Sequence, residues 1–122
     1  MISSLTILFG AMGAVTRFVV DALVKRAWPM RFPWATFLIN VTGSLLLGIL
    51  AGAILFQHQS ANWQNIIGTG FCGGYTTFST ASFETVRLAE QGAVRASLIN
   101  AFGSLITCVA ACAAGLALAW LV

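Results

Sequence analysis

The stretch Gly68–Phe83, which reads GTGFCGGYTTFSTASF, decides the fold of this chain. It lies inside an apolar segment of membrane-spanning length, and it holds four glycines followed by five Ser and Thr hydroxyls. Paired glycines weaken a helix, and Ser and Thr side chains compete for backbone hydrogen bonds. We therefore predict a helix break near Gly73–Thr77, with carbonyl oxygens free to bind an ion. The alternative is an unbroken Gly-rich helix that packs closely, with its hydroxyls bonded to its own backbone.

The composition indicates a membrane protein. Of the 122 residues, 59% are hydrophobic and 7% are charged, whereas a soluble domain of this size leaves much of its surface in water. A spanning helix needs about 20 apolar residues, so the chain has room for four. We expect an all-α membrane protein that forms a single transmembrane domain over residues 1–122, with helices at about 5–24, 33–56, 65–89 and 94–122. No cleavable signal-peptide pattern is visible, so we expect the first segment to remain as a helix.

Polar side chains stand out within the first two predicted spans. Arg17 and Asp21 are four residues apart, so they share a helix face and can form an ion pair. Arg17 either faces the interior of the bundle or snorkels toward the end of its helix. The amide of Asn40 would be costly against lipid, so it faces protein or a pore. Its NH2 group offers two donors that suit an anion, although an asparagine that joins two helices fits the pattern equally well.

In two of the predicted spans, residues of one kind recur every four positions and so share one helix face. In the second span, small residues predict a close helix contact; they are Ser44, Gly48 and Gly52. In the fourth segment, Asn100, Ser104 and Cys108 make one face mildly polar. That face is either a possible polar track along a pore or a set of hydrogen bonds between helices.

The charged residues gather in two of the three connections. Glu84, Arg87 and Glu90 follow one another at three-residue spacing, which predicts an ion-pair ladder on the end of the third segment. The connections on one side of the membrane carry most of the cations: Lys25, Arg26, Arg31, Arg87 and Arg95. The positive-inside rule therefore predicts that both termini lie outside the cytoplasm.

Several functional classes are disfavoured. The three cysteines (Cys72, Cys108 and Cys112) lie in predicted spans without CxxC spacing, and the only histidine, His58, lies in a connection. We therefore expect buried apolar thiols rather than a disulfide framework or a zinc site. There is no basic cluster with interleaved aromatics, so no nucleic-acid partner is expected. No nucleophile–base pair or carboxylate pair in a cleft is apparent, so the protein is not expected to be an enzyme.

Three stretches resemble the CrcB/Fluc family of fluoride channels. GAVTRF at Gly13–Phe18 is similar to the family's first-helix motif, and ATFLINVTGSLLLG at Ala35–Gly48 is similar to its second-helix motif, with Ala35 in place of a glycine. GFCGGYTTFST at Gly70–Thr80 resembles the third-helix signature and is the most specific of the three. The length and the four-span layout also match, and the resemblance covers the whole chain.

The resemblance implies a passive channel in the bacterial inner (plasma) membrane that exports cytoplasmic fluoride. It implies an antiparallel, dual-topology homodimer with two fluoride pathways and a broken third helix in each subunit. A structural sodium ion, which is not transported, would be held at the dimer centre by the main-chain carbonyls of Gly73 and Thr76. The implied pathway and vestibule residues are Asn40, Phe78, Ser79, Thr80 and Arg17.

The chain departs from the family pattern at one position, and two other functions compete with the fluoride-channel interpretation. Ala81 stands where the family commonly has a second phenylalanine, which bears on throughput and affinity. The bias of Lys and Arg toward one side is a second disagreement with the family, because dual topology favours balanced charge.

A small proton-coupled multidrug transporter would need a carboxylate deep in the membrane, and Asp21 lies near the end of its span. A non-conducting subunit of a membrane complex would use the Gly and Ser/Thr residues only for packing.

Overall fold

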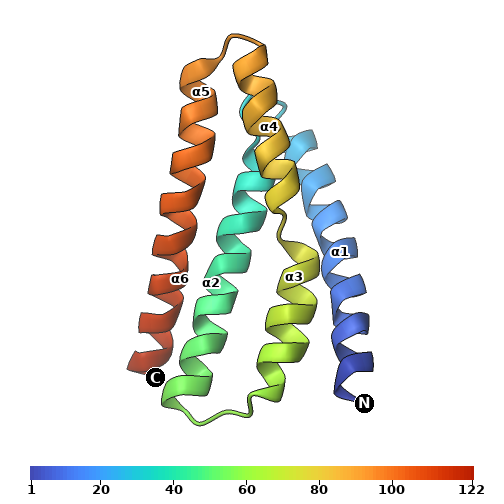
Figure 1. Ribbon diagram of the computed structural model, residues 1–122, viewed down its shortest axis with the longest axis vertical. Coiled ribbons are helices and arrows are strands. Elements are labelled where there is room, and N and C mark those ends of the chain that lie inside the picture. Colours follow the sequence, from blue (N-terminus) through green and yellow to red (C-terminus); the bar gives the residue numbers. More distant parts are fainter.

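The computed structural model describes residues 1–122 and consists of four helical rods (Figure 1). The first two rods are α1 (Ile2–Ala27) and α2 (Trp34–Phe56). The third comprises the π-helical η1 (Gln64–Cys72), the short α3 (Gly73–Tyr75) and α4 (Phe78–Glu90). The fourth runs without interruption through α5 (Val94–Leu98), the π-helical η2 (Ile99–Gly103) and α6 (Ser104–Leu121). The prediction of an all-helical, four-rod chain is confirmed.

Three of the rods could cross a membrane as single helices: Ile2–Ala27, Trp34–Phe56 and Val94–Leu121. Only 18 of the 122 residues are buried within the chain, and large apolar side chains such as Phe18 (75% exposed) and Ile106 (68% exposed) cover its outside. So much exposed apolar surface would be unfavourable in water, so it faces lipid or other protein.

The third rod is interrupted where the sequence predicted it. The helix ends at Tyr75, and the next two residues are extended, with φ −78° and ψ 160° at Thr76 and φ −149° and ψ 119° at Thr77. The Thr77 side chain then caps α4 by accepting the backbone N–H of Thr80 at 3.3 Å. A hydroxyl is a favoured cap because it satisfies one of the unpaired N–H groups at a helix start. The break, which Figure 1 shows between α3 and α4, is therefore followed directly by a capped helix.

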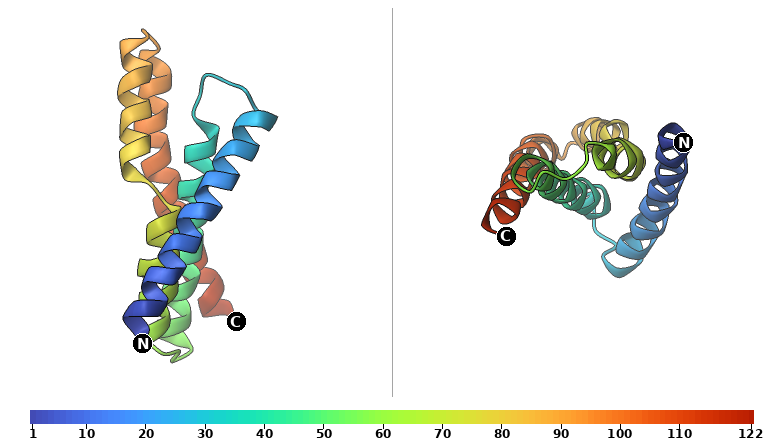
Figure 2. Two further views of the ribbon diagram at one scale, coloured as in Figure 1. Left: turned by 90° about the vertical axis from the view of Figure 1, so that its right-hand side faces the viewer. Right: turned by 90° about the horizontal axis from the view of Figure 1, so that it is seen from below.

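Glycines allow the rods to approach closely. A Cβ atom on Gly48 would collide with the carbonyl oxygen of Cys112, and one on Gly115 would collide with that of Leu45. The predicted ridge of small residues on α2 therefore contacts α6. Gly52 is part of this contact, because a Cβ atom there would meet Ala119 and Leu116. On the other side of the bundle, α1 crosses η1 and α3 (Figure 2), and a Cβ on Gly74 would collide with the Gly10 carbonyl oxygen.

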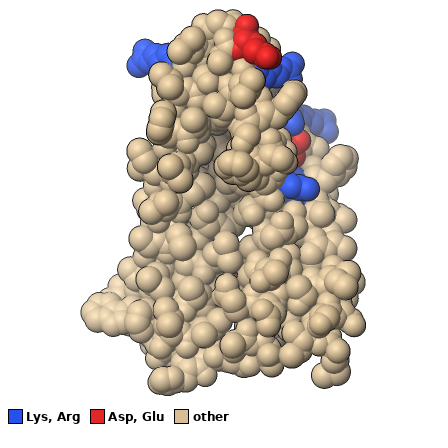
Figure 3. All heavy atoms as spheres, in the orientation of Figure 1, with Lys and Arg blue, Asp and Glu red and all other residues tan.

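Apart from Arg17, which lies beside the break, the charged side chains lie toward one end of the rods, where α1 joins α2 and α4 joins α5 (Figure 3). Both termini and the α2–η1 connection lie at the other end (Figure 1). The expected ion pairs are wrong in detail. Asp21 pairs with Lys25 at 2.7 Å rather than with Arg17, and this is the only ion pair in the chain. The predicted ladder from Glu84 to Glu90 therefore does not form.

Candidate ion pathway at the helix break

The break is held by the amide of Asn40 on α2. The Thr77 N–H donates to Asn40 Oδ1 at 2.8 Å, and Asn40 Nδ2 donates to the Thr77 carbonyl oxygen at 2.9 Å. The extended backbone of Thr77 cannot make regular helix bonds, so the amide replaces a donor and an acceptor at once. One hydrogen of the Asn40 NH2 group is used in this way, and one remains for another acceptor.

The interruption also frees carbonyl oxygens. In a continuous helix the N–H of Thr77 would bond to the carbonyl of Gly73, but Asn40 takes that N–H. The carbonyl of Thr76 accepts from Arg17 Nη1 at a long 3.4 Å. Gly73 is exposed, and a Cβ atom there would meet nothing within 4 Å. These neutral oxygens are the kind of ligand that a hard cation prefers, so the residues present fit the implied sodium ion.

Hydroxyls line the start of α4. The Thr77 hydroxyl donates to Thr80 Oγ1 at 3.0 Å, and it lies 3.5 Å from Ser79 Oγ. Phe78 begins the helix with 87% of its surface exposed, and Ser79 is also exposed. The first turn of α4 therefore presents an aromatic ring and a hydroxyl to whatever lies outside the chain.

A groove of about 590 Å³ runs from the break along α4 and α6. It brings together five of the candidate site residues from the sequence: Asn40, Thr76, Phe78, Asn100 and Ser104. Arg17, Ser79 and Thr80 lie near the break but do not line this groove. Of the three cysteines, Cys72 is buried, and Cys108 and Cys112 are half-buried. Cys108 also borders the groove.

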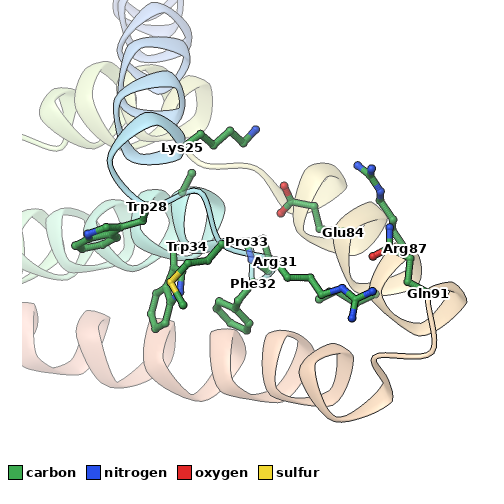
Figure 4. Close-up of a pocket in the computed structure, with 12 residues that line it drawn as sticks. Lys25, Trp28, Arg31, Phe32, Pro33, Trp34, Glu84, Arg87 and Gln91 are labelled. Atoms are coloured by element: carbon green, nitrogen blue, oxygen red, sulfur yellow. The ribbon is translucent and has the colours of Figure 1, made fainter.

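A second hollow, of about 330 Å³, lies at the charged end between α4 and the α1–α2 connection. Figure 4 shows Lys25, Arg31 and Arg87 around it, with Trp28 and Trp34 on the side of the connection. Tryptophans suit the headgroup level of a bilayer, which agrees with this end being a membrane surface. Glu84 also faces this hollow, and its Oε2 atom is buried without a hydrogen-bond partner. Three cations around one hollow make it a region that attracts anions.

Sequence reasoning missed two of the polar side chains that position α4. Ser97 and Thr85 lie on either side of the α4–α5 turn, and the Ser97 hydroxyl donates to the Thr85 carbonyl at 2.7 Å. The Thr85 hydroxyl accepts from Asn100 Nδ2 at the same distance. The repeat of polar residues along the fourth segment left Asn100 either on a polar track along a pore or in hydrogen bonds between helices, and it did not identify Thr85 as the acceptor.

Comparison with known proteins agrees with this architecture. The family model described as "CrcB-like protein, Camphor Resistance (CrcB)" matches residues 4–116. The chain belongs to the CrcB family. Among curated members, fluoride-specific ion channel FluC 1 of Leifsonia xyli subsp. xyli is 46% identical over 107 residues, which cover 88% of this chain and 78% of that protein. FluC 1 of Streptomyces avermitilis is 45% identical over 112 residues, which cover 91% and 90%. FluC 1 of Frankia casuarinae is 43% identical over 121 residues, which cover 94% and 93%.

These relatives are ion channels by name, so this CrcB member is not an enzyme. With three helices able to span a bilayer and bacterial relatives of this kind, it is a multi-pass protein of the bacterial plasma membrane. The earlier resemblance to the CrcB/Fluc family is thereby confirmed.

Proposed function

We propose that this protein is a fluoride-selective channel that lets cytoplasmic fluoride leave the cell by passive electrodiffusion. The observation that carries the proposal is the break in the third rod, where Asn40 and the start of α4 bring donors together in a chain whose relatives are named fluoride-specific ion channels. Fluoride is small and strongly hydrated, so a pathway must replace its water with donors at several moderate sites.

The donors are available near the groove. Asn40 has one uncommitted N–H, and the exposed Ser79 has a hydroxyl, with that of Thr80 one residue further on. The exposed ring of Phe78 can turn its positive edge toward an anion. The cations around the charged hollow, together with Arg17, raise the local fluoride concentration.

The functional unit proposed is an antiparallel homodimer with two pathways. A single copy leaves Phe78, Ser79 and Gly73 exposed beside an open groove. Polar backbone at membrane depth is tolerated only against protein, water or an ion, and a second copy would cover this region. Because the pair is antiparallel, some copies must insert with the charged end outside the cytoplasm.

A sodium ion at the dimer centre is part of the proposal. The carbonyl oxygens of Gly73 and Thr76 would hold it, and it would supply a fixed positive potential near the pathways without being transported. Arg17 already donates to the Thr76 carbonyl, so this chain places its own positive charge at the same oxygen.

The multidrug-transporter alternative receives no support from the ion pairs. Asp21, the only acid of the first rod, is bonded to Lys25 at 2.7 Å and is therefore not a free proton-coupling carboxylate. The test is direct. Vesicles loaded with fluoride and carrying the purified protein should release fluoride to an electrode when a potassium ionophore balances charge, and chloride-loaded vesicles should not release chloride. Proton-driven dye efflux without fluoride release would refute the proposal.

A further inference from the structure

A second polar cluster, apart from the break, joins α4 to the start of the fourth rod. We name it the α4 lock; its residues are Thr85, Ser97 and Asn100. Ser97 Oγ donates to the Thr85 carbonyl at 2.7 Å, and Asn100 Nδ2 donates to Thr85 Oγ1 at 2.7 Å. Asn100 is 2% exposed and Ser97 is 7% exposed. Buried polar groups of this kind rigidify a contact when they are fully satisfied.

The amide of Asn100 is directed toward α4 rather than toward an ion. Its Nδ2 donates to the carbonyl of Ala81 at 3.4 Å as well as to the Thr85 hydroxyl. An NH2 group has two hydrogens, so both are committed to α4. What remains on this side chain is a carbonyl oxygen, which repels an anion. Although Asn100 borders the groove, it has no donor left for fluoride.

α4 depends on this contact because its backbone connection is weak. The two extended residues Thr76 and Thr77 separate it from α3, and it packs mainly against α5 and η2. Phe78 lies seven residues before Thr85, which is about 10 Å along a helix. A tilt of about 10° at the lock would therefore move the first turn of α4 by about 2 Å. Misplacement on that scale is enough to spoil a constellation of donors.

We propose that Asn100 is a positioning residue, and that with Thr85 and Ser97 it fixes the direction of α4 so that Phe78 and Ser79 face the pathway. This inference rests on the proposed function for its consequence, but not for the hydrogen bonds themselves. Asn100 thus acts through α4 and makes no contact with the transported ion.

The test compares two single variants with their combination. Thr85→Val removes the nearer acceptor and leaves one N–H of the buried Asn100 amide without its partner. Asn100→Leu removes the amide at nearly constant size. Thr85→Val should lower fluoride flux per folded protein by about tenfold, because a buried amide N–H that loses its partner shifts the balance toward misplaced α4 by roughly that factor. Asn100→Leu should lower the flux by less, because the Thr85 hydroxyl loses the amide but keeps its bond to the Ala81 carbonyl of its own helix at 2.8 Å. The double variant should recover most of the flux, since replacing both partners by apolar groups is nearly neutral. Thr107→Val is the matched control, because that hydroxyl bonds only to Gly103 of its own helix.

Two outcomes would overturn the proposal. If the double variant stays as low as Asn100→Leu while Thr85→Val conducts normally, the amide acts on the ion itself. If both single variants conduct normally when folded, the lock has only a structural role. Should Asn100→Leu fail to fold, amide hydrogen exchange across Ser82–Val86 in Thr85→Val decides. Faster exchange than in Thr107→Val supports the lock, and unchanged exchange contradicts it. Because exchange does not depend on fluoride, a lock that holds in a protein without flux would refute the proposed function alone.

Discussion

Replacing Asn40 by aspartate tests the chemistry of the break with the smallest change of shape. In the native chain the Thr77 N–H lies 2.8 Å from Asn40 Oδ1, and aspartate keeps this acceptor. Aspartate lacks the Nδ2 donor, which in the native chain lies 2.9 Å from the Thr77 carbonyl oxygen. An oxygen then faces an oxygen at that position. Leaving a buried carbonyl unpartnered costs about 1–3 kcal/mol, which corresponds to roughly a fivefold to hundredfold loss of the competent arrangement.

The charge adds a second and larger effect. A carboxylate about 4 Å from a passing anion raises its energy by about 4 kcal/mol at an effective dielectric constant of 20, which is roughly a thousandfold in occupancy. We therefore expect Asn40→Asp to reduce fluoride efflux from vesicles to the level of empty vesicles at neutral pH. Asn40→Leu, which lacks both hydrogen bonds but carries no charge, should retain more flux than the aspartate variant.

The assay measures fluoride release with an ion-selective electrode, normalised to protein that elutes as a folded assembly. Thr6→Val is the matched control, because its hydroxyl bonds only to the Ile2 carbonyl of its own helix at 3.0 Å. Near-normal efflux through folded Asn40→Asp would refute the role of Asn40 as a donor beside the pathway. Greater loss in Asn40→Leu than in Asn40→Asp would show that the hydrogen bonds matter more than the charge.

Four further predictions concern the packing, the dimer, the exposed ring and the charge distribution. Gly74→Ala should lower the unfolding free energy by about 1–3 kcal/mol, because the added Cβ meets the Gly10 backbone. Gly73→Ala should not lower it, because a Cβ atom there meets nothing in this chain. Equal thermal stability of the two variants would contradict the packing of α1 against α3. Gly73→Ala should nevertheless impair dimer assembly in cross-linking if the partner covers this face. Phe78→Ile should reduce flux without reducing dimer yield, and unchanged flux would rule out the ring-edge contact. Adding lysine at Gln59, in the cation-free connection, should raise the fraction inserted with the charged end outside, as read by labelling of single cysteines, and a constant fraction would contradict the charge rule.

Local patterns predicted most of the fold. The Gly73–Gly74 pair and the following threonines placed the break within two residues of where it lies, because helix weakness is a property of neighbouring residues. The spacing of Gly48 and Gly52 likewise predicted a close contact, although it did not name α6 as the partner. Both signals depend on residues within a turn or two of one another.

Contacts between distant segments were not predictable in the same way. Arg17 donates to a carbonyl 59 residues away, and its expected partner Asp21 pairs with Lys25 instead. Helical spacing gave Asp21 two neighbours four residues away, and only the packing of α1 against the break decided between them. For the same reason the sequence identified Asn40 as unusual but did not predict that its amide would bond both polar groups of Thr77.

The most direct test of the central claim is the reversal potential of the purified protein in a planar bilayer, with fluoride on both sides at different concentrations and chloride on one side. A passive, fluoride-selective pathway predicts a potential set by the fluoride ratio alone, about 59 mV for each tenfold step, and unaffected by chloride or pH. A potential that follows chloride or the proton gradient, or the absence of any fluoride current, would contradict the account.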